Sequence, residues 1–359
     1  MSGSPSAIDG GGYEIHVREG ALRDAGLLVA RFAPAHHIAI VSDHVVAAIY
    51  AVPLAAALSS VLRGARISTH AIDSGERAKT RETWSALTDA LLDSGAGRDT
   101  TVVALGGGVV GDLAGFVAAT YMRGVPVVQL PTTLLAMVDA SVGGKTGVDT
   151  PAGKNLVGAF HPPAVVIADV STLETLPERE LRAGVAEMIK HAVIADASQL
   201  DRVATLADSQ EEMASAIRES VAIKARVVRE DAREQGLRKI LNFGHTLGHA
   251  IEAASGYSLL HGEAVAIGMV LESRLAERLG VAERGTARAV EYAVRAARLP
   301  AAIPTGIAAD TVLAATRSDK KARAGKVEYA LPARVGAMAG AESEWSIAAP
   351  DAEVRAILA

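Results

Sequence analysis

The first half of the sequence alternates short runs of β-branched residues with amphipathic stretches. Strands are predicted at 38–42, 67–72, 101–105, 125–130 and 165–169, and helices between them at 45–62 and 83–94. Strands that alternate with helices form a largely parallel sheet whose faces are covered by helices. The pattern therefore predicts an α/β, Rossmann-like N-terminal domain that binds its ligands at the carboxyl ends of the strands.

The pattern changes after Pro177. Apolar residues then recur every three or four positions, which predicts helices at 178–195, 209–233, 239–254, 263–279 and 282–297. The segment 326–331 is the only strand candidate in this half. A length of 359 residues fits two domains, and we predict a parallel-sheet domain at 1–175 and a mainly helical domain at 176–359.

Composition argues against several classes of protein. The net charge is −5 and aromatic residues make up 3% of the chain, whereas nucleic-acid surfaces are basic and often aromatic. The chain has no cysteine, so any metal must be held by histidines and carboxylates. The N-terminus lacks a signal-peptide pattern, and no window of about eighteen apolar residues stands out. We expect a cytoplasmic protein with neither a nucleic-acid nor a membrane partner.

Three of the ten histidines lie close together in the sequence. His245 and His249 are four residues apart, so they share one face of a helix, and His261 follows just beyond Gly256, which should end that helix. Three imidazoles placed in this way can converge on a metal ion. An i, i+4 pair is also an ordinary helix face, and the H-E-x-x-H motif is absent.

A glycine-rich turn follows the predicted strand at 101–105. The segment from Gly106 to Gly111 satisfies G-x-G-x-x-G between a strand and a helix, which presents backbone N–H groups to a pyrophosphate. The acid that usually holds the ribose about twenty residues later is missing. Either the segment is a simple tight turn, or the ribose is held by Asp43 or by the turn at 74–79, which would lie at the same sheet edge.

Several charged residues lie where anionic ligands could bind. A loop-rich stretch, 132–155, contains Asp139, Lys145, Lys154 and Asn155. The lysines there are either solvated or part of an anion site, and the spacing around Lys145 does not fit a Walker A loop. Glu187 lies among apolar residues, so it should pair with Lys190 or bind a metal. Further cations are Lys224, Arg238, Lys320 and Lys321.

Taken together, these motifs resemble the 3-dehydroquinate synthase family of the sugar phosphate cyclases. The similar segments occur in the family's order and span most of the chain: 75–79, 106–112, 121–124, 131–146, 153–155, 187–190, 236–249, 261–263 and 319–321. The resemblance implies a dehydroquinate synthase-like fold, in which an NAD-binding α/β domain precedes a helical metal- and substrate-binding domain.

The resemblance also implies roles for individual residues. Glu187, His245 and His261 would bind a zinc or cobalt ion, and His249 would face the substrate instead of serving as a third histidine ligand. NAD would contact Asp43, Ser74, Gly75, Glu76, Lys79, Gly107, Gly108, Val109, Val110, Gly111, Asp112, Thr132, Thr133, Lys145, Lys154, Thr172, Leu173, Glu174 and Thr175. The substrate would contact Asp139, Lys145, Asn155, Lys190, Lys224, Arg238, Asn242, His249 and one of Lys320 and Lys321. Arg123 would reach the phosphate held by the neighbouring subunit of a homodimer.

The reaction implied is that of a carbon–oxygen lyase acting on a phosphate. The family converts 3-deoxy-arabino-heptulosonate 7-phosphate to 3-dehydroquinate in the shikimate pathway of aromatic amino acid biosynthesis. Transient oxidation by NAD, phosphate elimination, re-reduction and intramolecular aldol closure follow one another. Alternatives are another sugar phosphate cyclase, such as an amino-dehydroquinate synthase, a metal-dependent polyol dehydrogenase, or a non-catalytic binding module. Arg238 and Asn242 favour dehydroquinate formation over neutral sugar phosphates, but they do not exclude the amino substrate.

Overall fold

The structure, a computed structural model, describes residues 7–206, 212–318 and 327–358. The chain divides into two units, Met1–Leu176 and Pro177–Ala359, and each is described by itself. Lys320 and Lys321, which were predicted as substrate contacts, lie outside the described residues.

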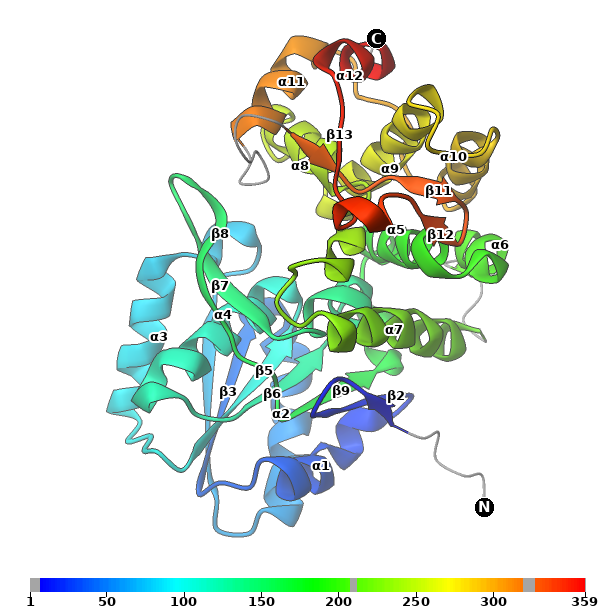
Figure 1. The fold of residues 1–359 in the computed structure, drawn as a ribbon. Helices are drawn as coiled ribbons and strands as arrows, with labels where there is room; N and C mark the ends of the chain where they lie inside the picture. The colour runs from blue at the N-terminus through cyan, green and yellow to red at the C-terminus, as the bar shows by residue number, and fades with distance from the viewer. Residues whose placement is uncertain (1–6, 207–211, 319–326, 359) are drawn as a thin grey trace. The chain divides into compact units, whose positions relative to one another are not determined.

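The N-terminal unit is built on a seven-stranded sheet. In spatial order its strands are β1 (Ile8–Asp9), β2 (Glu14–Arg18), β9 (Val165–Asp169), β6 (Val127–Pro131), β5 (Thr100–Gly106), β3 (His37–Asp43) and β4 (Arg66–Ile72) (Figure 1). Only β1 and β2 pair in antiparallel fashion within this sheet. The five predicted strands and the predicted parallel pairing are therefore confirmed.

Helices cover both faces of this sheet. Ile38 and Ile40 of β3 pack with α1 (Ala25–Phe32) and α2 (His44–Val61) on one face. Ala39 and Val41, which point the other way, pack with α3 (Arg81–Asp93) and α4 (Gly108–Thr120). Because successive strand residues alternate between faces, a strand buried on both sides must be apolar at nearly every position. The sequence of β5, Thr-Thr-Val-Val-Ala-Leu-Gly, meets this requirement and is buried throughout.

Helix α2 contradicts one expectation from the sequence. Among the described residues it is the one helix long and apolar enough to cross a membrane by length and composition, with a mean hydropathy of 1.8 over 18 residues. Only 17% of this window is buried. Ala51, Leu54 and Leu58 are buried against the sheet, whereas Val45 and Val52 are exposed. The expectation that such a window is absent was therefore wrong.

The stretch predicted as loop-rich, 132–155, is mostly regular structure. A turn of π-helix at Ala136–Ala140 is followed by a hairpin of β7 (Lys145–Thr150) and β8 (Gly153–Phe160). These strands were not predicted because they contain glycines, and glycine weakens a strand and usually marks a turn. Here it allows close approach, since a Cβ on Gly158 would lie 2.0 Å from the carbonyl oxygen of Thr146.

The C-terminal unit is mainly helical, as predicted. Its helices are α5 (Glu178–Ala195), α6 (Leu200–Ala204), α7 (Met213–Glu230), α8 (His245–Ala254), α9 (His261–Arg278), α10 (Thr286–Ala296), α11 (Ala309–Ser318) and α12 (Asp351–Leu358). Helix α9 packs against α5, α8, α10 and α12 and is buried over most of its length. It is therefore the helix around which this unit is organised.

Three details of the C-terminal unit differ from the prediction. The helix predicted at 239–254 is interrupted, because a 3₁₀ helix at Leu237–Asn242 ends before Gly244, whose φ of 79° is left-handed. Helices α11 and α12 were not predicted. Instead of one late strand, the described part of this unit contains four short ones, β10 (Glu328–Tyr329), β11 (Pro332–Arg334), β12 (Ala337–Met338) and β13 (Ile347–Ala348).

Candidate active site

The residues predicted to contact a dinucleotide gather at one edge of the N-terminal sheet. Asp43 ends β3, 74–79 follow β4, 107–112 follow β5, Thr132 and Thr133 follow β6, and 172–175 follow β9. All these positions lie at the carboxyl ends of parallel strands, the edge at which open α/β sheets bind ligands.

The glycine-rich turn brings the start of α4 close to the segment after β6. Gly107 caps α4, and a Cβ at this position would lie 3.2 Å from Cγ2 of Thr133. A Cβ on Gly108 would lie 3.3 Å from Cβ of Ala140. The backbone N–H of Thr132 donates to the carbonyl of Gly106 at 3.0 Å. The N-terminus of α4, with its outward-facing N–H groups, is thus held in the line of strand ends.

Charged and polar contacts tie several predicted residues together at this edge. The Lys79 ammonium, buried beneath the edge, donates to Oδ2 of Asp112 at 2.6 Å and to Oδ1 of Asn155 at 2.5 Å. Although burial lowers it, nearby carboxylates, Asp112 foremost, raise the pKa of Lys79. Nζ of Lys154 lies 3.6 Å from Oε1 of Glu76. Asn155, predicted to hold substrate, is therefore anchored through a residue predicted to hold NAD.

Asp43, one of the residues proposed for the ribose, has a defined orientation. Its Oδ1 accepts hydrogen bonds from the backbone of Val45 at 2.9 Å and Val46 at 3.1 Å, which caps α2. The same oxygen accepts from the hydroxyl of Ser74 at 3.0 Å. The two alternatives considered for the ribose, Asp43 and the turn at 74–79, thus meet at one place.

The remaining predicted residues of this unit lie on β7, in the π-helical turn, after β9 and in the turn after α4. Lys145 is exposed at the start of β7, and Asp139 is half-buried in the π-helical turn. The hydroxyl of Tyr50 contacts Oγ1 of Thr175 at 2.8 Å, which fixes the segment after β9. Arg123 is exposed and has a left-handed φ of 69°, directly after Met122 at 50°.

The C-terminal unit brings Glu187 together with two of the histidines. Oε1 of Glu187, on α5, lies 3.5 Å from Nε2 of His245 and 3.7 Å from Nε2 of His261. The Glu187 side chain is fully buried. Ligands held about 2.1 Å from a tetrahedral zinc ion lie roughly 3.4 Å from one another. The separations therefore fit a small cation bound among these three atoms.

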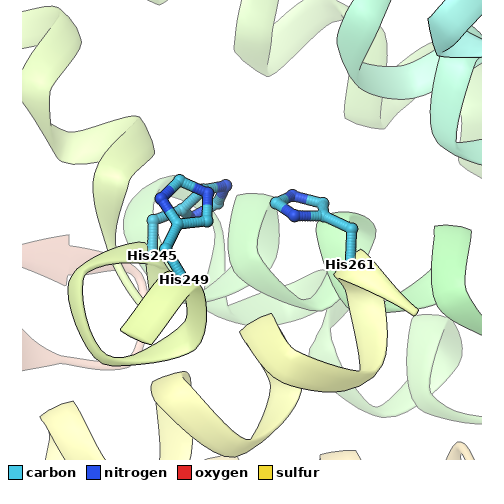
Figure 2. Close-up of side chains that lie close together, drawn as sticks. All are labelled: His245, His249 and His261. Atoms are coloured by element: carbon cyan, nitrogen blue, oxygen red, sulfur yellow. The ribbon is translucent and has the colours of Figure 1, made fainter. Parts of the chain in front are cut away.

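His249 lies beside the same group. His245 and His249 project from α8 and His261 from the start of α9, and the three rings face a common space (Figure 2). The ring centre of His249 is 5.3 Å from that of His245 and 5.4 Å from that of His261. One ligand nitrogen from each ring lies within 4.8 Å of the others. The spacing thus leaves room for either the three-histidine set or the set that includes Glu187.

In His245 and His261, the Nδ1 atom lies beside an oxygen that determines which ring nitrogen carries the proton. Nδ1 of His245 lies 3.1 Å from the carbonyl oxygen of Phe243, and Nδ1 of His261 lies 3.4 Å from Oε2 of Glu252. A carbonyl or ionised carboxylate oxygen only accepts, so both Nδ1 atoms carry the proton. Each ring then presents Nε2 toward Glu187, which is the arrangement found around metal-binding histidines.

The electrostatics of the cluster favour a positive charge at its centre. Burial, followed by the charge of Lys190, lowers the pKa of His245 well below its usual value. Although burial also opposes it, hydrogen bonds to Glu187 and Glu252 raise the pKa of His261 to about 9. A positive charge beside Glu187 and Glu252 is therefore favoured, and a bound cation would supply one.

Lys190, one turn beyond Glu187 on α5, completes the buried cluster. Its ammonium is ion-paired with Glu187, and both side chains are almost wholly buried. From the sequence, Glu187 was expected either to pair with Lys190 or to bind a metal. Its Oε2 is paired with Lys190 while its Oε1 faces the two histidines, so one carboxylate can make both interactions. Lys224, on α7, and Arg238 are also buried cations of this unit.

Arg238 and Asn242 belong to the 3₁₀ helix that leads into α8. Nη1 of Arg238 donates to the carbonyl of Ala232 at 2.7 Å. Nδ2 of Asn242 donates to Oε1 of Glu234 at 2.7 Å, so the amide oxygen of Asn242 faces away from that carboxylate. Glu234 itself has a left-handed φ of 58°. Both predicted substrate residues are therefore held in fixed orientations by the loop at 231–236.

Sequence reasoning missed the carboxylates that hold these groups. Glu234, Glu252 and Glu272 each contact a site residue or the backbone beside one. Glu272 directly follows the apolar run Ala264–Leu271 of α9, so the argument applied to Glu187, an acid beside apolar residues, would have identified it.

Comparison with known proteins gives a consistent match over both units. The family model described as 3-dehydroquinate synthase N-terminal matches residues 69–183, and the model described as 3-dehydroquinate synthase C-terminal matches residues 184–322. A 3-dehydroquinate synthase from Xanthomonas campestris pv. campestris (strain 8004) is 48% identical over 335 residues, which are 90% of each chain.

Solved structures of two related cyclases are also similar. A 2-deoxy-scyllo-inosose synthase, solved with carbaglucose-6-phosphate, NAD⁺ and Co²⁺, has a TM-score of 0.90 at 26% identity and covers 98% of each chain. The 2-epi-5-epi-valiolone synthase from Streptomyces hygroscopicus subsp. jinggangensis 5008, solved with NAD⁺ and Zn²⁺, has a TM-score of 0.85 at 32% identity. The match covers 96% of this chain and 95% of that one.

Proposed function

The chain belongs to the 3-dehydroquinate synthase family, and we propose that it converts 3-deoxy-arabino-heptulosonate 7-phosphate to 3-dehydroquinate and phosphate. The reaction is a carbon–oxygen lyase reaction of aromatic amino acid biosynthesis. NAD and a divalent ion, zinc or cobalt, are its cofactors, as in the two cyclase structures solved with NAD⁺ and Co²⁺ or Zn²⁺.

One observation carries the metal assignment. Nε2 of His245 and Nε2 of His261 both approach Oε1 of Glu187, while their Nδ1 protons are engaged elsewhere. We infer that these three atoms hold the divalent ion and that His249 faces the substrate. When bound, NAD supplies a reversible hydride acceptor, and the divalent ion supplies a Lewis acid for the substrate's hydroxyl and carbonyl oxygens.

The residues of the chain bind and orient the substrate. Lys190, Lys224 and Arg238 offset the negative charges of a substrate that carries both a carboxylate and a phosphate. With one of its two amide N–H donors directed to Glu234, Asn242 presents its amide oxygen to a substrate hydroxyl. Since elimination and aldol closure need little beyond correct geometry, this tight holding accounts for much of the rate. Asp139, Lys145, Asn155 and one of Lys320 and Lys321 complete the proposed substrate set.

The proposed NAD site is the sheet edge that runs from Asp43 to the segment after β9. The N-terminus of α4 faces the pyrophosphate, and Asp43 with Ser74 holds a ribose. Lys79 and Asp112 hold each other and thereby join the turn after β4 to the N-terminal half of α4, the two segments that would hold NAD.

We further propose that the enzyme acts in the cytoplasm as a homodimer, with no nucleic-acid or membrane partner. Arg123 is exposed, and both it and the preceding Met122 have a left-handed φ. Such a strained backbone is retained most often at functional positions. This supports its predicted role in reaching the phosphate held by the neighbouring subunit.

The test is phosphate release from a panel of substrates with catalytic NAD, with and without a chelator. The panel holds heptulosonate, amino-heptulosonate, sedoheptulose and glucose phosphates. Release from 3-deoxy-arabino-heptulosonate 7-phosphate that needs both NAD and metal is the expected result. Preference for the amino substrate, for sedoheptulose phosphate or for glucose phosphate would indicate another cyclase. Net accumulation of NADH would indicate a dehydrogenase, and NAD binding without phosphate release a non-catalytic module.

A further inference from the structure

Helix α8, which carries His245 and His249, begins at a residue that cannot cap it. The capping position is Gly244, which has no side chain to accept a hydrogen bond from the first backbone N–H groups. A larger residue does not fit there, since a Cβ would lie 2.4 Å from Cγ of Met269 and 2.9 Å from the carbonyl oxygen of Val265. The close packing of α8 on α9 therefore requires glycine at the position where a cap is needed.

Glu272 of α9 supplies the missing cap. Its Oε2 accepts from the backbone N–H of Gly244 at 2.6 Å, and its Oε1 accepts from that of Leu247 at 2.9 Å. These are the two N–H groups that the reciprocal side chains of a capping box satisfy within one helix. Here one carboxylate from a neighbouring helix satisfies both. The side chain is fully buried, so its charge must be stabilised by these bonds and by the N-terminus of α8.

A single peptide group links Glu272 to the imidazole of His245 through two hydrogen bonds. The N–H of the peptide group that joins Phe243 to Gly244 donates to Glu272, and its carbonyl oxygen accepts from Nδ1 of His245. A charge on one side of a peptide group polarises it, which strengthens the hydrogen bond on the other side. This series of hydrogen-bonded groups runs from the Glu272 carboxylate through the peptide group to the His245 imidazole, whose Nε2 faces Glu187.

We propose that Glu272 is a positioning residue for His245, which holds the Nδ1–H tautomer and the ring orientation through the Phe243–Gly244 peptide group. Because Glu272 and His261 lie on the same helix, α9 carries one proposed ligand and fixes the backbone of another. The role of Glu272 in fixing the His245 tautomer concerns the metal-free protein and does not depend on the proposed function. Its expected consequence, a higher affinity for the divalent ion, rests on that function.

The chain offers a matched control on the same helix. Oε1 of Glu277 accepts from the backbone N–H groups of Gly285 at 2.9 Å and Ala287 at 2.8 Å, and thereby caps α10, which also begins after a glycine. None of the proposed site residues lies on α10. Glu277 is half-buried and caps through one oxygen, so Glu277→Gln removes a helix-capping charge from the same helix without altering the environment of His245.

The experiment compares Glu272→Gln with Glu277→Gln and the unsubstituted protein. In Glu272→Gln the amide group faces one of the two N–H donors, so the cap is broken while the volume is kept. We expect the affinity for Co²⁺, measured by competition with a chelator, to fall about 10–100-fold, the usual effect of removing a group that orients a metal ligand. The visible absorption spectrum of the cobalt site should change as well, whereas Glu277→Gln should leave affinity and spectrum unaltered.

A second measurement separates this proposal from the metal assignment. Nitrogen chemical shifts of the His245 imidazole in the metal-free protein report its tautomer directly. The unsubstituted protein should hold the Nδ1–H form, Glu272→Gln a mixture, and Glu272→Asp, which keeps the charge, an intermediate value. Should Glu272→Gln fail to fold, Glu272→Asp gives the same comparison. An unchanged tautomer in both variants would overturn the proposal, as would equal effects of Glu272→Gln and Glu277→Gln on the cobalt site. Absence of Co²⁺ binding by the unsubstituted protein would overturn the metal assignment instead.

Discussion

The proposed site residues of the two units include charged pairs in opposite environments. In the N-terminal unit the residues follow strand ends, and a pair such as Lys154 and Glu76 is about one-third to two-fifths exposed. In the C-terminal unit the pair of Glu187 and Lys190 is at most 1% exposed. An exposed pair contributes little because water screens it, whereas a buried charge that loses its partner is strongly destabilising. The partly exposed pairs at the sheet edge should therefore tolerate single changes that the helical cluster does not, whereas the buried Lys79 should be as sensitive as the cluster.

The largest expected effect is that of removing a proposed ligand from the cluster. His261→Ala should weaken metal retention by more than about 100-fold, beyond the effect of altering a group that only orients a ligand, and should abolish turnover. NAD affinity should remain nearly intact, because its proposed contacts lie in the other unit. Metal content after dialysis and calorimetric titration with NAD measure the two properties.

His249→Ala is the matched variant for this test. It removes an imidazole from the same group of three rings, but we expect it to retain the metal and to slow turnover. Loss of metal from His249→Ala with retention in Glu187→Gln would favour the three-histidine set. Full turnover of His261→Ala in metal-free buffer would contradict the assignment of the site altogether.

The next effect compares a buried lysine with a partly exposed one. Lys190→Ala leaves Glu187 buried without its ammonium partner, and the free energy of unfolding of the metal-free protein should fall by about 3–5 kcal/mol. Lys154→Ala should cost less than about 1 kcal/mol. Adding a divalent ion should restore part of the loss in Lys190→Ala, since a cation beside Glu187 takes over the role of the lysine charge. Denaturant titrations with and without metal provide the values, and equal losses in the two variants would refute the comparison.

A third comparison concerns glycines. A Cβ on Gly268 would lie 2.0 Å from the carbonyl oxygen of Gly244, and backbone atoms cannot move aside as a flexible side chain can. Gly268→Ala should destabilise the protein by about 1–3 kcal/mol or more and should weaken metal binding. Gly20 is left-handed, with a φ of 69° and a ψ of 15°, but has no atom within 4 Å of an added Cβ. Gly20→Ala should therefore cost only about 1 kcal/mol, the price of the backbone conformation. Calorimetric melting ranks the two variants, and a larger loss for Gly20→Ala would be inconsistent with close helix packing as the main constraint.

The difference between local constraints and constraints set by a neighbouring element explains which parts of the fold could be predicted from the sequence. Runs of β-branched residues identified β3, β4, β5, β6 and β9, and apolar periodicity identified α5 with its observed ends. Both signals are local. The hairpin of β7 and β8 was missed because its strands contain glycines that are explained only by the backbone of the partner strand. The break at Gly244 was missed for a similar reason, since the neighbouring helix determines it.

The candidate site divides in the same way. The family resemblance supplied the residues that face ligands, since these form recognisable motifs along the chain. It did not supply Glu252 and Glu272, whose roles arise where α8 packs on α9. Their partners are nine and 25 to 28 residues away in sequence, so no spacing rule within one helix connects them. Residues that orient a ligand are therefore harder to predict from one sequence than the ligands themselves.

A smaller effect than those of Lys190→Ala and Gly268→Ala is expected from a carboxylate in a turn of the C-terminal unit. The carboxylate of Asp231 accepts backbone N–H groups from Gln235, Gly236 and Arg238, at 3.0, 2.7 and 3.1 Å. Although burial opposes them, these bonds hold the pKa of Asp231 below its ordinary value. Asp231→Asn should cost about 1–2 kcal/mol at neutral pH, because an amide accepts more weakly than a carboxylate.

The dependence of this loss on pH follows from the direction of the pKa shift. A carboxyl group whose pKa is lower in the folded state stabilises the protein fully above its unfolded pKa of about 3.9, and the contribution disappears as the pH falls through the folded pKa. The difference in unfolding free energy between the unsubstituted protein and Asp231→Asn should therefore be constant near neutrality and shrink below about pH 4. A difference that grew on acidification would mean that the turn at 231–236 is stabilised by something other than this charge.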